Sequence, residues 1–578
     1  MLQPLPLVLA LLQLLITFGA AYPASGAQVI LQDGNGADET KLGAVASENA
    51  ICSQIGIDIL KQGGNSADAL IGTTICVGVI GMYHSGIGGG GFMLVRSPNG
   101  TYEAIDFRET APAAAFEDMY KSNVEGSVTG GLASGVPGEL RGLEYLHSHY
   151  GLLPWRTVFQ PAIKVARDGF PVNADLVRIM HDTIKLGGHN FLTLDPSWAM
   201  DFAPNGTLLG LGDIMTRKRF AQTLETIAEW GADAFYAGPI AKTMIAALEA
   251  SNGTMTMEDL ANYSVVLREP VSIDYRGHRV TSMGSPSSGT TLLSALKIVE
   301  GFQGFEEPDM LNLSTHRLVE ATRFAYGKRS ELGDPSFLDE YIDQYERNMT
   351  SGKETVRMRG MISDFSTLNV SAYNPSGFEN RETHGTSHIV TADASGLAIT
   401  MTTTINGWFG SQVMVPETGI IMNNEMNDFS IPNTTNIFGY VPSPSNYIRP
   451  GKRPLSSITP IIATHSLSSP LPYLIIGAAG GSRIITSTLQ CVWHVLDHHM
   501  NVPAALEMPR FHDQLMPNLM FHESAYDTST ISFLKNLNHN ATEMPSYLSA
   551  VQGIRWLPNG TFEAAGEPRQ MESAGLAV

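Results

Sequence analysis

Apolar residues near the start of the chain recur at helical intervals. From Ser47 onward they fall three and four positions apart, which predicts a helix with one buried face. The residues of that face are Ile51, Cys52, Ile55 and Ile59. The pair Gly63–Gly64 is expected to end this helix. A second helix over Ala67–Val79 then follows, with Asn65 or Ser66 as its N-terminal cap.

Glycines crowd the chain between residues 86 and 91, directly before the strand-like stretch Phe92–Val95. A dinucleotide-binding loop needs its glycines after a strand and before a helix, so this cluster does not indicate one. We interpret it as backbone packed closely against a neighbouring element, because residues without a Cβ allow such an approach.

The middle of the chain, from about 130 to 350, predicts a layer of helices. Amphipathic segments recur there without a repeat of fixed length, and they include Gly138–Tyr150, Trp155–Asp168 and Pro239–Ala250. Residues 350–385 are polar and rich in Arg, Ser, Asn and Gly, which indicates an exposed loop.

Beyond residue 385 the pattern becomes typical of β-structure. Strands are expected at His388–Thr391, Ala398–Thr404 and Gly419–Asn423, the first two joined by a turn at Asp393–Gly396. The change of composition at this point marks either a domain boundary or a place where the chain is opened.

Length and composition indicate a large globular core. The chain has 578 residues, of which 43% are hydrophobic and 57 are glycine, so both two domains and one large domain remain open. The net charge is -20, and no basic run with interleaved aromatic residues is present. A nucleic-acid partner is therefore not expected.

The first residues are typical of a signal peptide. The apolar stretch Leu5–Ile16 is followed by small residues up to Ala21, so residues 1–21 are expected to be removed and the protein secreted. The alternative is a retained type II membrane anchor over Leu5–Tyr22, facing outside. No Lys or Arg precedes the stretch to hold that topology, which favours secretion.

In a secreted protein, N-x-S/T sequons can carry glycans and cysteines can form disulfides. A subset of the sequons is expected to carry glycans. They begin at Asn99, Asn205, Asn252, Asn262, Asn312, Asn348, Asn369, Asn433, Asn540 and Asn559. Cys52 and Cys76 lie on successive predicted helices, and an oxidising compartment would let them form a disulfide. Cys491 is left over and is interpreted as a small buried apolar residue.

Several common catalytic motifs are absent from the sequence. It contains no G-x-S-x-G, H-E-x-x-H, Walker A or C-x-x-C motif. Cys491, His494 and His498 share one helical face, but apolar residues surround them. We interpret them as ordinary core or surface side chains rather than as metal ligands.

The segment Thr383–Gly410 reads THGTSHIVTADASGLAITMTTTINGWFG and resembles the gamma-glutamyltransferase family. In that family a Thr, a small residue and a His open the small subunit, and here these are Thr386, Ser387 and His388. The resemblance continues through Gly396, Thr404, Ile405, Asn406, Phe409 and Gly410.

Other motifs of the same family follow in the expected order over nearly the whole mature chain. They are IDFRETAP from Ile105, NNEMNDFS from Asn423, KRPLSSITP up to Pro460 and GAAGGS from Gly477. One departure is Asn427, where many relatives carry Asp, but the neighbouring Asp428 is kept.

The resemblance implies an α+β fold, the four-layer αββα sandwich of the Ntn-hydrolases. A large subunit, residues 22–385, and a small subunit, residues 386–578, would arise by self-cleavage between Gly385 and Thr386 and intertwine as a heterodimer in one structural unit. The implied activity moves the γ-glutamyl group of glutathione and other γ-glutamyl compounds to water or to amino-acid or dipeptide acceptors. No metal or organic cofactor is implied.

The chemistry of threonine supports this interpretation. Its hydroxyl is a weak nucleophile and needs a base, which the α-amine of an N-terminal Thr386 would supply. In the family the uncut Thr attacks the preceding carbonyl, and water opens the resulting ester. Gly385 suits this step because a residue without a Cβ tolerates a strained backbone.

A γ-glutamyl group carries an α-carboxylate and an α-ammonium, so its site needs both cations and carboxylates. By resemblance, Arg108, Ser456 and Ser457 would hold the carboxylate, the Arg by a two-pronged pair. The groups implied for the ammonium are Asn406, Glu425 and Asp428. Near the nucleophile, Thr404 would orient Thr386, and the backbone N–H groups of Gly480 and Gly481 would stabilise the oxyanion.

Two rival functions remain. A cephalosporin or glutaryl acylase shares the fold and the self-cleavage, but the set Arg108, Asn406, Glu425 and Asp428 favours a glutamyl group. An unprocessed, inactive relative would act as a binding protein. A further expectation concerns Asn436–Pro450, a proline-rich loop that we expect to cover the bound glutamyl group.

Overall fold

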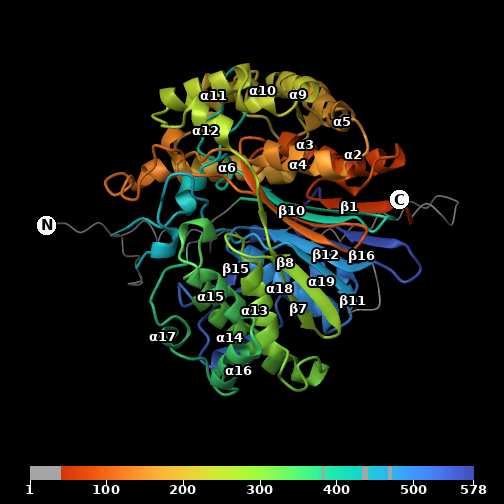
Figure 1. Cartoon of the computed structure of the whole chain (residues 1–578), viewed down its shortest axis with the longest axis vertical. Coiled ribbons are helices and arrows are strands. Elements are labelled where there is room, and N and C mark those ends of the chain that lie inside the picture. Colours follow the sequence, from red (N-terminus) through yellow and green to blue (C-terminus); the bar gives the residue numbers. More distant parts are fainter. Residues whose placement is uncertain (1–40, 381–384, 433–440, 466–470) are drawn as a thin grey trace.

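The computed structural model describes residues 41–380, 385–432, 441–465 and 471–578. Two β-sheets lie face to face between two layers of helices, as Figure 1 shows. The chain thus has the four-layer αββα arrangement expected from the resemblance. The predicted signal peptide, residues 1–21, lies outside the described residues.

The first sheet has seven strands, and all its pairings are antiparallel. In spatial order they are β18 (Ala574–Ala577), β1 (Gly43–Ser47), β9 (Ser387–Asp393), β10 (Ala398–Thr404), β2 (Gly90–Arg96), β3 (Tyr102–Phe107) and β6 (Val266–Arg268). Every residue of β9 and β10 is buried, because these central strands are covered on both faces.

The second sheet has six strands and packs against the first through contacts of β12 with β9 and β10. Its spatial order is β17 (Phe562–Ala565), β16 (Ala550–Trp556), β12 (Pro472–Ala479), β11 (Ile461–His465), β8 (His278–Met283) and β7 (Pro270–Tyr275). Both sheets combine strands from before and after the Gly385–Thr386 bond. Cutting that bond would therefore leave both pieces within one fold.

Helices from the first half of the chain cover the outer face of the first sheet, at the top of Figure 1. The longer ones are α2 (Ala50–Lys61), α3 (Ser66–Ile80), α4 (Glu139–Tyr150), α5 (Trp155–Asp168), α6 (Ala174–Gly187), α9 (Lys218–Trp230) and α11 (Pro239–Ala250). The shorter ones are α7 (Phe191–Leu194), α8 (Pro196–Phe202), α10 (Asp233–Tyr236) and α12 (Met257–Asn262). Helix α3 is buried along its whole length, since α2, α5 and β9 surround it.

The other helical layer covers the second sheet, at the bottom of Figure 1. It contains α13 (Gly289–Val299), α14 (Leu311–Arg329), α15 (Tyr341–Met349), α16 (Gly352–Met361), α17 (Val370–Tyr373), α18 (Arg483–Leu496), α19 (Val502–Glu507) and α20 (Thr528–Asn536). Helices α13, α18 and α19 contact the sheet directly. Small sheets complete the fold, with strands β13 (Phe511–His512), β14 (Met520–Glu523), β15 (Ala541–Met544), β4 (Phe170–Pro171) and β5 (Ile214–Met215).

Several predicted elements are confirmed. Helix α5 and helix α11 have the predicted bounds, and Asn65 caps α3 in a reciprocal capping box with Asp68. The glycine cluster is packed backbone, since a Cβ on Gly89 would overlap the carbonyl oxygen of Thr404. A disulfide joins the predicted pair Cys52 and Cys76, whose Cα atoms are 5.3 Å apart, and Cys491 is a buried free thiol.

Two predictions about helices were wrong. Ile51 is 36% exposed, because the buried face of α2 covers a narrower part of the helix than its apolar residues occupy. The supposed loop of residues 350–385 contains α16 and α17. Helix α16 is capped by Ser351 but buries only Thr355 and Met358, so its apolar signal is too sparse to see in the sequence.

The predicted strand Gly419–Asn423 is also wrong. Ile421 forms only an isolated bridge with Met414, after a turn in which Thr418 N–H donates to Val415 O. The side chain of Asn423 instead donates to the carbonyl of Gly88 at 2.8 Å and so braces the glycine cluster.

No helix within the described ranges is both long and apolar enough to cross a membrane.

Candidate active site

Thr386 lies directly before the central strand β9, close to the end of β12. Its side chain is buried, and its Oγ1 accepts a hydrogen bond from Gly480 N–H at 2.9 Å. Gly480 has a φ of 122°, and a Cβ there would overlap the carbonyl oxygen of Leu548. Glycine is therefore required where the backbone meets the hydroxyl. Gly481 follows with a φ of 61° and leads into α18.

The bond before Thr386 is held in a conformation that favours glycine. Gly385 has a φ of 102°, and a Cβ there would overlap the carbonyl oxygen of Asn406. The carbonyl oxygen of Gly385 accepts a hydrogen bond from Thr404 Oγ1 at 2.7 Å. Asn406 N–H in turn donates to Thr404 Oγ1, also at 2.7 Å. In the uncut chain, Thr404 thus polarises the carbonyl that precedes the candidate nucleophile.

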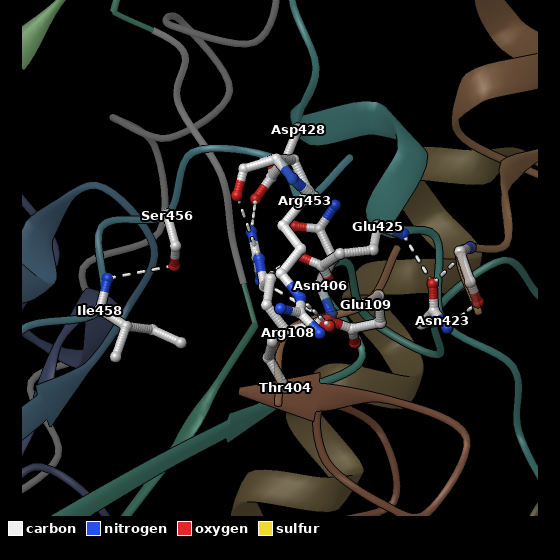
Figure 2. A network of polar contacts seen from close by, with 12 residues as sticks. Arg108, Glu109, Thr404, Asn406, Asn423, Glu425, Asp428, Arg453, Ser456 and Ile458 are labelled. Carbon is white, nitrogen blue, oxygen red and sulfur yellow. Dashed lines mark hydrogen bonds and ion pairs between the residues drawn. The ribbon is translucent and has the colours of Figure 1, made fainter. Parts of the chain in front are cut away.

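Arg108 is fixed at the end of β3 and forms the centre of a buried ion cluster. Its backbone N–H donates to Asp106 Oδ1 at 3.0 Å, and the side chain is 1% exposed. Its guanidinium pairs with Glu425 through one terminal nitrogen and with Asp428 through the other. Figure 2 shows this fork between the two carboxylates.

A short 3₁₀ turn presents both carboxylates to Arg108. The turn η6 spans Glu425–Asp428, and residues three apart in such a turn project on the same side. Asn423 Oδ1 accepts from Glu425 N–H at 2.9 Å and holds the start of the turn in place. The predicted motif from Asn423 onward therefore presents both carboxylates to Arg108 from one short turn.

Burial sets the charges of this cluster. Burial raises the pKa of Glu109 to about 7, although Arg108, whose Nη1 lies 3.9 Å away, opposes this. Burial likewise raises the pKa of Glu425 well above its ordinary value. Burial lowers the pKa of Arg108, but Glu425 and Asp428 outweigh this and leave it raised. Arg108 is therefore a permanent cation beside two carboxyl groups, those of Glu109 and Glu425, whose pKa values are raised.

The two predicted serines face different partners. Ser456 Oγ accepts from Ile458 N–H at 3.2 Å, as Figure 2 shows at the left. Ser457 Oγ accepts from Arg329 Nη2 at 3.2 Å. The predicted amide of Asn406 donates to the carbonyl of Asn424 at 3.0 Å.

A small cavity is lined by one residue predicted for the carboxylate, Ser457, and one predicted for the ammonium, Asp428. Its lining residues are Arg329, Ser330, Glu379, Asp428, Ser430, Ser443, Asn446, Leu455 and Ser457. Ser443 and Asn446 belong to the loop that was expected to cover the site, so this described part of the loop borders the cavity. Asn436–Tyr440, the start of that loop, lies outside the described residues.

Sequence reasoning missed Glu109 and Arg329 as members of the site. Glu109 stands next to Arg108 in a quoted motif, and that adjacency was the available signal. Arg329 ends α14, where a basic residue is ordinarily only a favourable partner of the helix dipole. No sequence signal separates it from such a residue.

Possible metal ligands lie elsewhere and are already engaged. In the described part of the chain, His316, Glu320 and His539 form a buried group of possible ligands. His316 is hydrogen-bonded to His539 at 2.8 Å and to Ser363 O at 2.7 Å, and Glu320 accepts from two hydroxyls. These side chains thus take part in the hydrogen bonding of the core.

Comparison with protein families gives one match along almost the whole chain. A family described as gamma-glutamyltranspeptidase matches residues 52–577. The glutathione hydrolase proenzyme of Arthroderma benhamiae is 56% identical over 93% of each chain. The glutathione hydrolase of Aspergillus flavus is 48% identical over 98% of this chain and 94% of its own.

Solved structures share the fold. Cephalosporin acylase from Bacillus halodurans has a TM-score of 0.81 at 26% identity and covers 97% of this chain and 99% of its own. A chain of gamma-glutamyltranspeptidase from Helicobacter pylori has a TM-score of 0.54 at 30% identity and covers 58% of this chain and 95% of its own. The fold alone therefore does not decide which acyl group is bound, and the residues of the site have to be considered.

Proposed function

We propose that this chain, which belongs to the gamma-glutamyltranspeptidase family, cuts itself before Thr386 and then acts as a glutathione hydrolase and γ-glutamyltransferase. The observation that carries the proposal is the buried fork of Arg108 between Glu425 and Asp428. Such a cluster offers a cation and two carboxylates at one place, which matches the two charges of a γ-glutamyl group.

Self-cleavage would start from the contacts that the uncut chain makes around the Gly385–Thr386 bond. Thr386 Oγ attacks the carbonyl carbon of Gly385, and the hydrogen bond from Thr404 stabilises the charge that develops on the carbonyl oxygen. The C–N bond breaks, the nitrogen of Thr386 takes up a proton, and an ester remains. Water then hydrolyses the ester and leaves Gly385 with a carboxylate and Thr386 with a free hydroxyl and amine.

The same hydroxyl then serves as the nucleophile toward substrate. The freed amine accepts its proton, and Oγ attacks the γ-carbonyl of the donor. Gly480 N–H already reaches Oγ, and with Gly481 it can donate to the oxyanion that forms. The leaving amine takes the proton, and the γ-glutamyl ester passes to water, an amino acid or a dipeptide.

Substrate binding in this site would exchange ion pairs rather than bury bare charges. The α-carboxylate of the donor replaces Glu425 and Asp428 as a partner of Arg108, and its α-ammonium pairs with the released carboxylates. A glutaryl group has a carboxylate that can pair with Arg108 but no ammonium, so it would leave the displaced Glu425 and Asp428 without a cationic partner. This asymmetry favours a glutamyl donor over the glutaryl group of the acylase alternative.

The glutamyl specificity can be measured with two anilide donors. We expect γ-glutamyl p-nitroanilide to be cleaved with a kcat/KM about tenfold or more above that of glutaryl p-nitroanilide, since an unpaired buried polar group costs about 1–3 kcal/mol. The cost stays limited because Glu425, with its raised pKa, can take up a proton. Addition of a dipeptide should accelerate amine release from the glutamyl donor only. A preference for the glutaryl donor would instead assign the chain to the acylases.

We also propose that the protein passes through the secretory pathway. The predicted signal peptide, the Cys52–Cys76 disulfide and the sequons support this. Sequon asparagines with exposed side chains are Asn99, Asn205, Asn252, Asn262, Asn348, Asn369, Asn540 and Asn559. Asn312 is half-buried, and Asn433 lies outside the described residues. Treatment of the protein from its native host with an N-glycosidase should lower its apparent mass, and an unchanged mass would count against glycosylation.

A further inference from the structure

Arg329 is a buried cation at the edge of the proposed donor site. It is the last residue of α14, is 6% exposed, and lines the same cavity as Asp428 and Ser457. Within the described ranges no carboxylate forms an ion pair with it. A buried guanidinium without a carboxylate partner is unusual, because the charge has lost its water.

The contacts of Arg329 tie it to both predicted serines. Its Nη2 donates to Ser457 Oγ at 3.2 Å, and its Nε donates to Ser288 Oγ at 2.8 Å. Ser288 Oγ in turn donates to the carbonyl oxygen of Ser456. The guanidinium of Arg329 thus contacts the hydroxyl of Ser457 directly. It contacts the backbone of Ser456 indirectly, through Ser288.

The charges around Arg108 favour a second cation in the donor site. Three carboxyl groups, those of Glu109, Glu425 and Asp428, surround its single guanidinium. An incoming α-carboxylate would therefore meet a region in which the available positive charge is already paired. Burial lowers the pKa of Arg329, and Tyr326 and Asp428 oppose this only in part, but a guanidinium stays charged in proteins.

We propose that Arg329 is a second cation of the donor site, which positions Ser457 and adds its charge to that of Arg108 in binding the donor α-carboxylate. This inference rests on the proposed function. Arg329 lines the cavity and has no carboxylate partner within the described ranges, so it can pair with an incoming anion directly. Arg108 must first be released from its carboxylates. Arg329 thus supports recognition of the carboxylate end, and the carboxylates of η6 serve the ammonium end.

The test compares donors with and without the charge that Arg329 is proposed to bind. The donors are γ-glutamyl p-nitroanilide and its α-methyl ester, in which the carboxylate is neutral. We expect Arg329→Gln to raise the KM for the charged donor about tenfold while the KM for the ester changes less than twofold. Arg317→Gln is the matched control, because Arg317 lies on the same helix but pairs with the partly exposed Asp364. It should leave both donors unchanged.

The outcomes separate this inference from the proposed function. Equal losses with both donors would overturn the charge-binding role and leave Arg329 as a structural residue only. If Arg329→Gln remains uncut, Arg329→Met, which also removes the charge, replaces it, and a KM increase confined to the charged donor is again required. A wild-type protein that is cut but releases no amine from γ-glutamyl p-nitroanilide would refute the proposed function itself.

Discussion

Thr386→Ala is expected to remain a single uncut chain without hydrolase or transferase activity. The substitution removes the hydroxyl that accepts a hydrogen bond from Gly480 N–H, so neither the self-cleavage nor the later attack on substrate has a nucleophile. Wild-type protein should give two bands on a denaturing gel, and the variant one. Amine release from γ-glutamyl p-nitroanilide should fall to the level of the buffer alone.

Thr386→Ser is the matched control, since it keeps the hydroxyl and should still be cut, at a reduced rate. The folded state of the alanine variant can be checked by thermal unfolding, because only a buried hydroxyl and methyl group are lost. Two fragments from Thr386→Ala, the first ending at Gly385, would mean that an external protease cuts the chain.

The position of the cut explains why the new N-terminus would stay in place. Thr386 leads into β9, which pairs with β1 on one side and with β10 on the other. Cleavage would free the chain on the Gly385 side while the hydrogen bonds of β9 hold the nucleophile beside Gly480. The two products would remain together because the strands of both sheets come from both of them.

Local sequence patterns were sufficient for elements that bury a clear apolar stripe. Helix α5 shows this, since it buries Val158, Phe159, Ala162, Ile163 and Ala166 along one face. The pattern failed for α16, which packs through two residues, and for Gly419–Asn423, whose apolar residues pack from an irregular segment. In both cases tertiary contacts decide the conformation, and periodicity does not record them.

Sequence motifs named several residues of the candidate site but missed Glu109 and Arg329, and they did not predict the contacts within it. The motifs identified Arg108, Glu425 and Asp428, yet their pairing with one another depends on how β3 meets η6. The same holds for Arg329, which reaches Ser457 only because α14 ends beside the cavity. Such long-range contacts depend on the topology of the fold, so local patterns in one sequence cannot predict them.

Arg108→Lys is expected to leave self-cleavage intact and to raise the KM for γ-glutamyl donors. A lysine keeps the charge but has no planar fork, so it cannot hold two oxygens of a carboxylate at once. Losing a charge-assisted hydrogen bond costs about 1.5–3 kcal/mol, or a roughly 13- to 160-fold loss in kcat/KM. The loss should fall mainly on KM, because Arg108 binds the end of the donor that does not react. Processing should be unaffected, since the contacts of Gly385 and Thr386 do not involve Arg108.

Arg219→Lys provides the matched control for this change. Arg219 is a part-buried arginine that, like Arg108, has several partners, among them Asp201 and the carbonyl oxygen of Ser197, but it lies in the helical layer away from the cavity. It should retain the wild-type KM. Steady-state kinetics with γ-glutamyl p-nitroanilide measure both variants, and a gel shows that each is cut. Unchanged kinetics in a fully cut Arg108→Lys would remove Arg108 from the donor site, and the paired charges around it would then be only a structural feature of the core.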